Sequence, residues 1–202
     1  MKFSKINKHF FPELDDVRQS YMYLHGEINH ESTAPLIQEL IAAHMELTEI
    51  ERSDPEDPEN EFDEPDHVLN LCICSSGGEL APAMSLIAVM EASEIPIRTI
   101  ALGECGSAAL MIFLAGQQRV VTPYSSILSH QFWSGLEGSF ASIKASMTEF
   151  NNYHEKIVKF YQERTGLSRE MVEKHLLKDT DSWLKPEEAV QFGLADIMCD
   201  LK

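Results

Sequence analysis

Residues 68–78 read VLNLCICSSGG, and residues 95–115 read IPIRTIALGECGSAALMIFLA. Each stretch opens with a nearly continuous apolar run, which favours a strand that is buried on both faces of a parallel sheet. Each run ends in a glycine turn, at residues 75–78 in the first stretch and at residues 103–107 in the second, and a helical pattern follows each turn. This repeated order of strand, glycine turn and helix predicts an α/β fold with a parallel sheet.

The rest of the chain supplies further elements of the same kind. Apolar residues recur every three or four positions along 139–164, which predicts a long amphipathic helix that Gly166 ends. Ser168 is placed to cap the next helix, and Pro186 and Gly193 bracket the last one. The expected strands are 21–25, 68–74, 95–102, 120–121 and 127–129, and the expected helices are 32–47, 80–92, 107–115, 139–164, 169–177 and 186–192.

Length and composition bound the class of protein. With 202 residues, of which 44% are hydrophobic and 24% charged, the chain fits one globular domain. Its 16 Lys and Arg against 33 Asp and Glu give a formal charge of -17, the wrong sign for binding nucleic-acid backbones or anionic membranes. Four scattered cysteines, no signal peptide and no apolar run of about 18 residues predict a cytoplasmic protein with reduced thiols.

Residues 51–66, ERSDPEDPENEFDEPD, form the clearest break in composition. They hold nine acidic residues, one arginine and three prolines. Because proline interrupts backbone hydrogen bonding and like charges repel, the stretch is predicted to be an exposed loop inserted into a compact body. It lacks the central glycine and the ligand spacing of an EF-hand loop, so a solvated loop is favoured over a calcium site.

Ser107 is the first candidate for catalysis. It stands where the helix 107–115 begins, beside that helix's unpaired amides and positive dipole end, and a serine there can act as a nucleophile. The plainer interpretation is an N-cap, which requires the same residue at the same place. Gly77 and Gly78 bear on this choice, because paired glycines leave backbone N–H groups unshielded, as an oxyanion hole requires. Alternatively, they form a plain tight turn.

A nucleophilic serine needs a base. Of the eight histidines, His130 stands out because it ends the predicted strand 127–129 and can project from a sheet edge where loops gather. An acid must hold its imidazole in the right tautomer, and Asp181 is one candidate among many, which spacing alone does not select. Cys105, two residues before Ser107, is either a reactive thiol or a packed side chain.

An ordered set of motifs carries a family resemblance over about residues 21–199. In order, its members are Gly26-Glu27-Ile28-Asn29, Ser75-Ser76-Gly77-Gly78, Gly103 with Ser107, Pro123 with His130-Gln131, Gly135 with Gly138, and PEEAVQFGLAD at 186–196. Each motif alone is weak, but the set in this order resembles the ClpP family, the proteolytic subunit of the ATP-dependent Clp protease. The resemblance implies the crotonase-like α/β fold of repeated strand-strand-helix turns, with residues 132–166 as a protruding handle.

The same resemblance assigns roles by position. Ser107 corresponds to the nucleophile, His130 to the general base and Asp181 to the orienting acid, and the backbone amides of Gly78 and Ala108 correspond to the oxyanion hole. The implied reaction is serine-type hydrolysis of peptide bonds in unfolded polypeptides, with no metal or cofactor in this chain. ATP would be used only by a partner, a Clp-type AAA+ ATPase.

The resemblance also implies how the chain is organised. Residues 1–20 would form an N-terminal axial-type segment, and residues 21–202 a single protease domain with 51–66 as its acidic insertion. The protein would assemble with itself into a heptameric ring or a double-ring tetradecamer. It would work in the cytoplasm, or in the host cytoplasm if a virus encodes it.

Two other functions remain open at this stage. Paired backbone donors also stabilise enolates, so a crotonase-like fold could serve an enzyme that acts on acyl-thioesters. Alternatively, the chain is a catalytically silent ring subunit that regulates an active paralogue. Tight binding of acyl-CoA would favour the first, and activity confined to mixed assemblies would favour the second.

Overall fold

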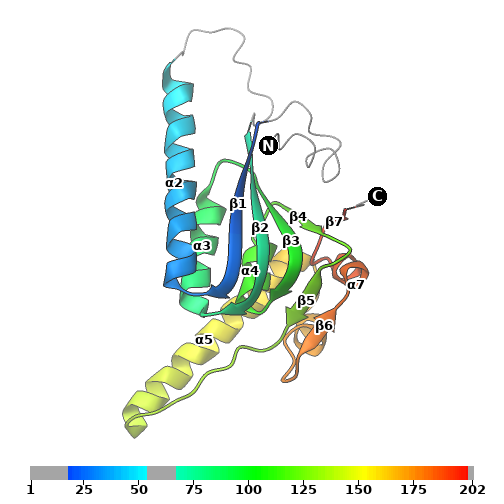
Figure 1. The fold of residues 1–202 in the computed structure, drawn as a ribbon. Coiled ribbons are helices and arrows are strands. Elements are labelled where there is room, and N and C mark those ends of the chain that lie inside the picture. Colours follow the sequence, from blue (N-terminus) through cyan, green and yellow to red (C-terminus); the bar gives the residue numbers. More distant parts are fainter. Residues whose placement is uncertain (1–17, 54–66, 200–202) are drawn as a thin grey trace.

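The computed structural model describes residues 18–53 and 67–199, which form one sheet with helices packed on it (Figure 1). The strands are β1 (Arg18–Ile28), β2 (His67–Gly78), β3 (Ile97–Gly106), β4 (Gln118–Val121), β5 (Ser126–Ser129), β6 (Ser182–Leu184) and β7 (Ile197–Met198). They run in the order β1-β2-β3-β4-β7, and β5 pairs with both β3 and β6. Within the described residues every pairing is parallel except that of β5 with β6. The predicted parallel α/β fold is confirmed.

The helices begin and end largely where the sequence signals place them. They are α2 (His30–Ser53), α3 (Leu80–Ala92), α4 (Ala108–Leu114), α5 (Phe140–Thr165), α6 (Arg169–His175) and α7 (Pro186–Gln191). The side chains of Ser139 and Ser168 cap α5 and α6 by accepting hydrogen bonds from backbone amides of the first turn. Gly166 ends α5 in the left-handed conformation, with φ 73°.

Several boundaries differ from the sequence prediction, and β3, for example, continues to Gly106 instead of ending at Leu102. β2 continues through the glycine turn, because Gly78 still pairs with Ile28 of β1. β1 is also longer than predicted, because its pairing with β2 begins at Arg18. α2 continues to Ser53, so the first three residues of the predicted acidic loop 51–66 are helical, and residues 54–66 lie outside the described residues.

The core lies on both faces of the sheet, as the unbroken apolar runs predict. Successive residues of β3 point to opposite faces: Ala101 joins the main cluster beneath the helices, whereas Ile100 joins a small cluster with Val120 and Cys199. α4 is buried along its whole length. This arrangement holds the ends of β2, β3 and β5 rigidly beside one another.

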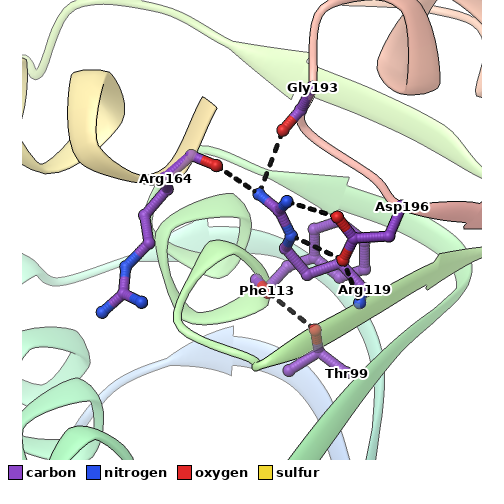
Figure 2. A network of polar contacts seen from close by, with 6 residues as sticks. All are labelled: Thr99, Phe113, Arg119, Arg164, Gly193 and Asp196. Carbon is purple, nitrogen blue, oxygen red and sulfur yellow. Dashed lines mark hydrogen bonds and ion pairs between the residues drawn. The ribbon is translucent and has the colours of Figure 1, made fainter. Parts of the chain in front are cut away.

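Arg119 of β4 ties the C-terminal part of the chain to the sheet (Figure 2). Its guanidinium donates to the carboxylate of Asp196 through Nε (3.0 Å) and Nη2 (2.5 Å). Its Nη1 donates to the backbone carbonyls of Arg164 (2.8 Å) and Gly193 (3.0 Å). Arg164 itself pairs with Glu91 of α3. One side chain therefore fixes the end of α5, the turn after α7 and β4 relative to one another.

α5 projects beyond the sheet, with the connection from β5 running alongside it (Figure 1). Its first half is mostly exposed, and its buried residues, Ile157, Val158 and Tyr161, all lie in the second half. The buried part of the helix is therefore its C-terminal half, and the resemblance assigns the region 132–166 to a protruding handle.

Candidate active site

Two strand-to-helix turns meet at one edge of the sheet. Residues 75–78 form the end of β2, just before α3, and residues 103–106 form the end of β3, with Ser107 between β3 and α4. A Cβ atom placed on Gly77 would lie 2.7 Å from the Cβ of Ser107 and 3.1 Å from the amide nitrogen of Ala108. Because real Cβ atoms essentially never come within 3.0 Å of another heavy atom, only glycine lets the two turns approach this closely.

Ser107 adopts a strained conformation at the start of α4. Its φ is 53° and its ψ is -121°, and among the described residues no other non-glycine residue has a positive φ. Such conformations cost about 1–3 kcal/mol and concentrate at functional sites. Ser107 occupies the N-cap position, but its side chain accepts no hydrogen bond from the helix. The capping interpretation is therefore wrong, and the hydroxyl is left for other chemistry.

Ser107 and His130 line the same small pocket. His130 is half-buried and directly follows β5, which is tied to the serine turn because the Ser107 N–H donates to the carbonyl of Leu128 (2.9 Å). The other lining residues are largely apolar: Leu80, Ala108, Met111, Phe132, Ile157, Tyr161 and Leu177. Two side chains from different strand ends are thus brought to one concave, mainly apolar site, the usual setting of a ligand pocket.

The hydrogen bond of His130 defines its tautomer. The Nδ1 atom lies 2.5 Å from the backbone carbonyl oxygen of Gln131. Because a carbonyl oxygen accepts and cannot donate, this contact places a proton on Nδ1, and in the neutral ring the lone pair is then on Nε2. That tautomer is the one required of a general base that acts through Nε2. Within the described residues, no hydrogen bond joins His130 to the hydroxyl of Ser107.

The pairing of β5 with β6 brings Asp181 close to His130, but Asp181 does not line the pocket. It is exposed and immediately precedes β6, in which Ser182 lies opposite Ser129 of β5. In the part of the chain that the structure describes, its carboxylate makes no hydrogen bond to His130. The structure therefore brings Ser107 and His130 into one pocket, and it leaves Asp181 near His130 without a hydrogen bond to it. The roles assigned to the three residues stay predictions.

The backbone amides of Gly78 and Ala108 are those that the resemblance assigns to an oxyanion hole. Glu79 N–H donates to the carbonyl of Ile28 (2.8 Å), and neighbouring amides along a strand point to opposite sides. The amide that donates to Ile28 at this point is therefore that of Glu79 and not that of Gly78. Ala108 is the first residue of α4, and the first amides of a helix have no partner within it. A Cβ on Gly78 would lie 2.3 Å from the Ile28 oxygen, so this position also requires glycine.

Two polar residues of the site escaped sequence reasoning. Ser75 is buried, and its hydroxyl accepts a hydrogen bond from the Gly77 N–H (3.1 Å), which holds the first glycine turn. Tyr161 of α5 lines the pocket, and its hydroxyl lies 3.3 Å from that of Ser129. Burial raises the pKa of Tyr161 to about 12, so the hydroxyl keeps its proton at neutral pH. In the sequence, Tyr161 is indistinguishable from the other apolar residues of its helical stripe.

The cysteines near the site are structural. Cys105 is fully buried in the main core, and burial, with smaller contributions from Cys74 and Glu104, raises the pKa of its thiol far above the usual value. A thiol held neutral in this way is a poor nucleophile, so the packing interpretation is confirmed. Burial likewise raises the pKa of Cys72, to about 11. In residues 18–53 and 67–199, no group of three His, Cys, Asp or Glu side chains is arranged to hold a metal ion.

Fold and sequence comparison together define the class of this protein. A parallel sheet whose strands end in turns converging on Ser107 is the crotonase-like α/β fold that the resemblance implied. A sequence model of the Clp protease family matches residues 60–201, so the chain belongs to the Clp protease family and is of the protease class. β1 and α2 precede the matched range, although β1 pairs with β2 along its length. No described helix combines the length and apolar character needed to cross a membrane.

Proposed function

We propose that this protein is a serine endopeptidase that hydrolyses peptide bonds in unfolded polypeptides. Ser107 is the nucleophile, His130 the general base and Asp181 the acid that orients it. The observation that carries the proposal is the pocket shared by Ser107 and His130, in which the serine hydroxyl is not used to cap its helix. Membership of the Clp protease family supports the same reaction.

The reaction follows the usual course of acyl transfer to serine. The Ser107 hydroxyl oxygen attacks the carbonyl carbon of the substrate while its proton passes to Nε2 of His130, and the amides of Gly78 and Ala108 stabilise the negative oxygen. His130 then gives the proton to the leaving amine, and the C–N bond breaks to leave an ester on Ser107. Water, deprotonated by His130, hydrolyses that ester and restores the enzyme.

The role of Asp181 rests on the pairing of β5 and β6. Ser129 and Ser182 face each other in this antiparallel pair, so His130 and Asp181 leave facing ends of the same ladder. Directly opposed residues of such a pair have Cβ atoms about 5 Å apart. A carboxylate at that range can replace the Gln131 carbonyl as the acceptor for Nδ1–H, and its charge stabilises the imidazolium more strongly than a neutral carbonyl does.

We also propose that the protein works as a ring of identical subunits, fed by a Clp-type AAA+ ATPase. Family membership supports this assembly, and so does the projecting first half of α5 (Figure 1). Two large apolar side chains on that segment, Phe140 and Met147, are 85% and 49% exposed. Apolar side chains on a projecting helix suit a contact between copies of the chain.

The test is hydrolysis of an unfolded, fluorescently labelled protein and of short fluorogenic peptides, under conditions in which mass photometry detects assembled rings. We expect Ser107→Ala and His130→Ala each to lower kcat/KM by about 10³-fold or more. The matched control Ser85→Ala removes an exposed serine hydroxyl from α3, and hydrolysis should not change. Hydrolysis that survives Ser107→Ala, or none by assembled wild-type protein, would reject the proposal.

A catalytically silent ring subunit is the second candidate. The observation that favours it is the lack, among the described residues, of any hydrogen bond joining the side chains of Ser107, His130 and Asp181. Such a subunit would support hydrolysis only in mixed rings with an active paralogue. In those rings, Ser107→Ala in this chain would leave the rate unchanged.

A further inference from the structure

Three residues near the pocket carry buried hydroxyl groups. The residues that carry them, Ser129, Tyr161 and Ser182, are only 0%, 2% and 7% exposed. Ser129 and Ser182 are directly opposed in the pairing of β5 with β6, so their side chains lie on the same face. Tyr161 reaches them from α5, with 3.3 Å between its hydroxyl oxygen and that of Ser129.

Two of the three hydroxyl hydrogens in this group have no acceptor among the described residues. The bond between Ser129 and Tyr161 uses one of their two hydrogens, and within the described residues neither hydroxyl has another partner. The hydroxyl of Ser182 is buried with no hydrogen-bond partner in the same part of the chain. Each hydroxyl supplies one donor, so two donors lack an acceptor. A buried donor left in this way costs about 1–3 kcal/mol, which favours the arrival of an acceptor with a ligand.

Tyr161 is the member of this group that also lines the pocket beside Ser107. The neighbouring walls, formed by Met111, Ile157 and Leu177, are apolar. A side chain that enters must therefore be aliphatic along its length and carry its polar group at the tip. A charged tip would lose its hydration without gaining an opposite charge, so an uncharged acceptor is favoured.

We propose that Tyr161 is a specificity-determining residue for the hydrolysis described above, on which this inference rests. Its hydroxyl, backed by Ser129, donates to an uncharged acceptor at the tip of the substrate side chain on the acyl side of the scissile bond. Glutamine has this combination of an aliphatic stem and an amide tip. Methionine has nearly the same length and shape without the amide, and sites that hydrogen-bond a substrate group discriminate against analogues that lack it.

The experiment compares two fluorogenic peptides that differ only in Gln or Met on the acyl side of the cleaved bond. We expect the Gln-to-Met ratio of kcat/KM to fall about 3- to 10-fold in Tyr161→Phe, the effect of one lost hydrogen bond. Ser129→Ala should lower the ratio as well, because the phenol loses the partner that orients it. Tyr153→Phe removes a hydroxyl from the same helix outside the pocket, and its ratio should equal that of the wild type.

The outcomes distinguish this specificity proposal from the proposed serine endopeptidase function on which it rests. Labelling of Ser107 by a fluorophosphonate verifies that each variant has folded, and Ser129→Ala decides the question if Tyr161→Phe does not fold. If the Gln-to-Met ratios of Tyr161→Phe and Ser129→Ala equal the wild-type ratio while cleavage still depends on Ser107, the specificity proposal alone is overturned. A water molecule bound permanently to the Tyr161 hydroxyl would give this result. Cleavage by the wild type that does not depend on Ser107 would overturn the proposed function and this inference together.

Discussion

Replacing Gly77 with alanine should disable the site and leave the fold intact. The new Cβ would lie 2.7 Å from the Cβ of Ser107 and 2.8 Å from the carbonyl oxygen of Gly106, whereas ordinary contacts begin at 3.4 Å. The serine turn must therefore move by about 0.7 Å. Because a misplacement of about 1 Å at a reacting group costs about 10²-fold in rate, kcat/KM for peptide hydrolysis should fall by about 100-fold.

Substitutions at two further glycines distinguish the effect of a steric clash from that of backbone strain. Gly77 has φ +111°, and Gly26 has φ +81° with no heavy atom within 4 Å of the position that a Cβ atom would take, so Gly26→Ala adds strain alone. That strain should lower the free energy of unfolding by about 1–2 kcal/mol, measured in urea, and leave kcat/KM within about twofold of the wild type. Gly135→Ala, in open space without a positive φ, should change neither quantity. A folded Gly77→Ala protein that hydrolyses peptides within threefold of the wild-type rate would refute the reasoning.

Two more predictions concern the stability of the body that holds the site. Arg119→Ala should lower the free energy of unfolding by about 2–3 kcal/mol in urea, because it removes the donor for the carbonyls of Arg164 and Gly193 and leaves the Asp196 carboxylate only its hydrogen bond from the backbone amide of residue 119. A loss below about 0.5 kcal/mol would contradict the anchoring role. Burial raises the pKa of Tyr161 from 10.0 to about 12, so the folded state holds this proton more tightly than the unfolded chain does. The resulting stabilisation is complete below pH 10. As the pH rises from about 10 to 12, the free energy of unfolding should therefore fall by about 2–3 kcal/mol, and this fall should be absent from Tyr161→Phe.

Elements with strong local signals were predictable from the sequence. The helix 80–92 follows a glycine turn, and α5 has a serine cap at one end and a glycine stop at the other. β6 and β7 were missed, because they are three and two residues long and too short to show a period. Their strand character comes from pairing with β5 and β4, which local sequence does not encode.

The site was predictable to the extent that it follows strand ends. His130 stands directly after the predicted strand 127–129, and Ser107 ends the glycine turn that follows the predicted strand 95–102. Parallel strands bring their carboxyl ends to one edge of a sheet. Whether Ser107 caps its helix depends on the backbone angle at one residue, which no pattern specifies. The contact of Tyr161 with Ser129 joins two elements 32 positions apart, so it depends on tertiary packing that periodicity does not report.

The most direct test of the central claim is the site and rate of labelling by a fluorophosphonate, followed by mass spectrometry of the assembled protein. The account predicts that the phosphonyl group is found on Ser107, and that His130→Ala slows its formation by about 100-fold or more, because the hydroxyl loses its base. A label on any other residue, or a labelling rate of Ser107 that is the same with and without the His130 imidazole, would contradict it.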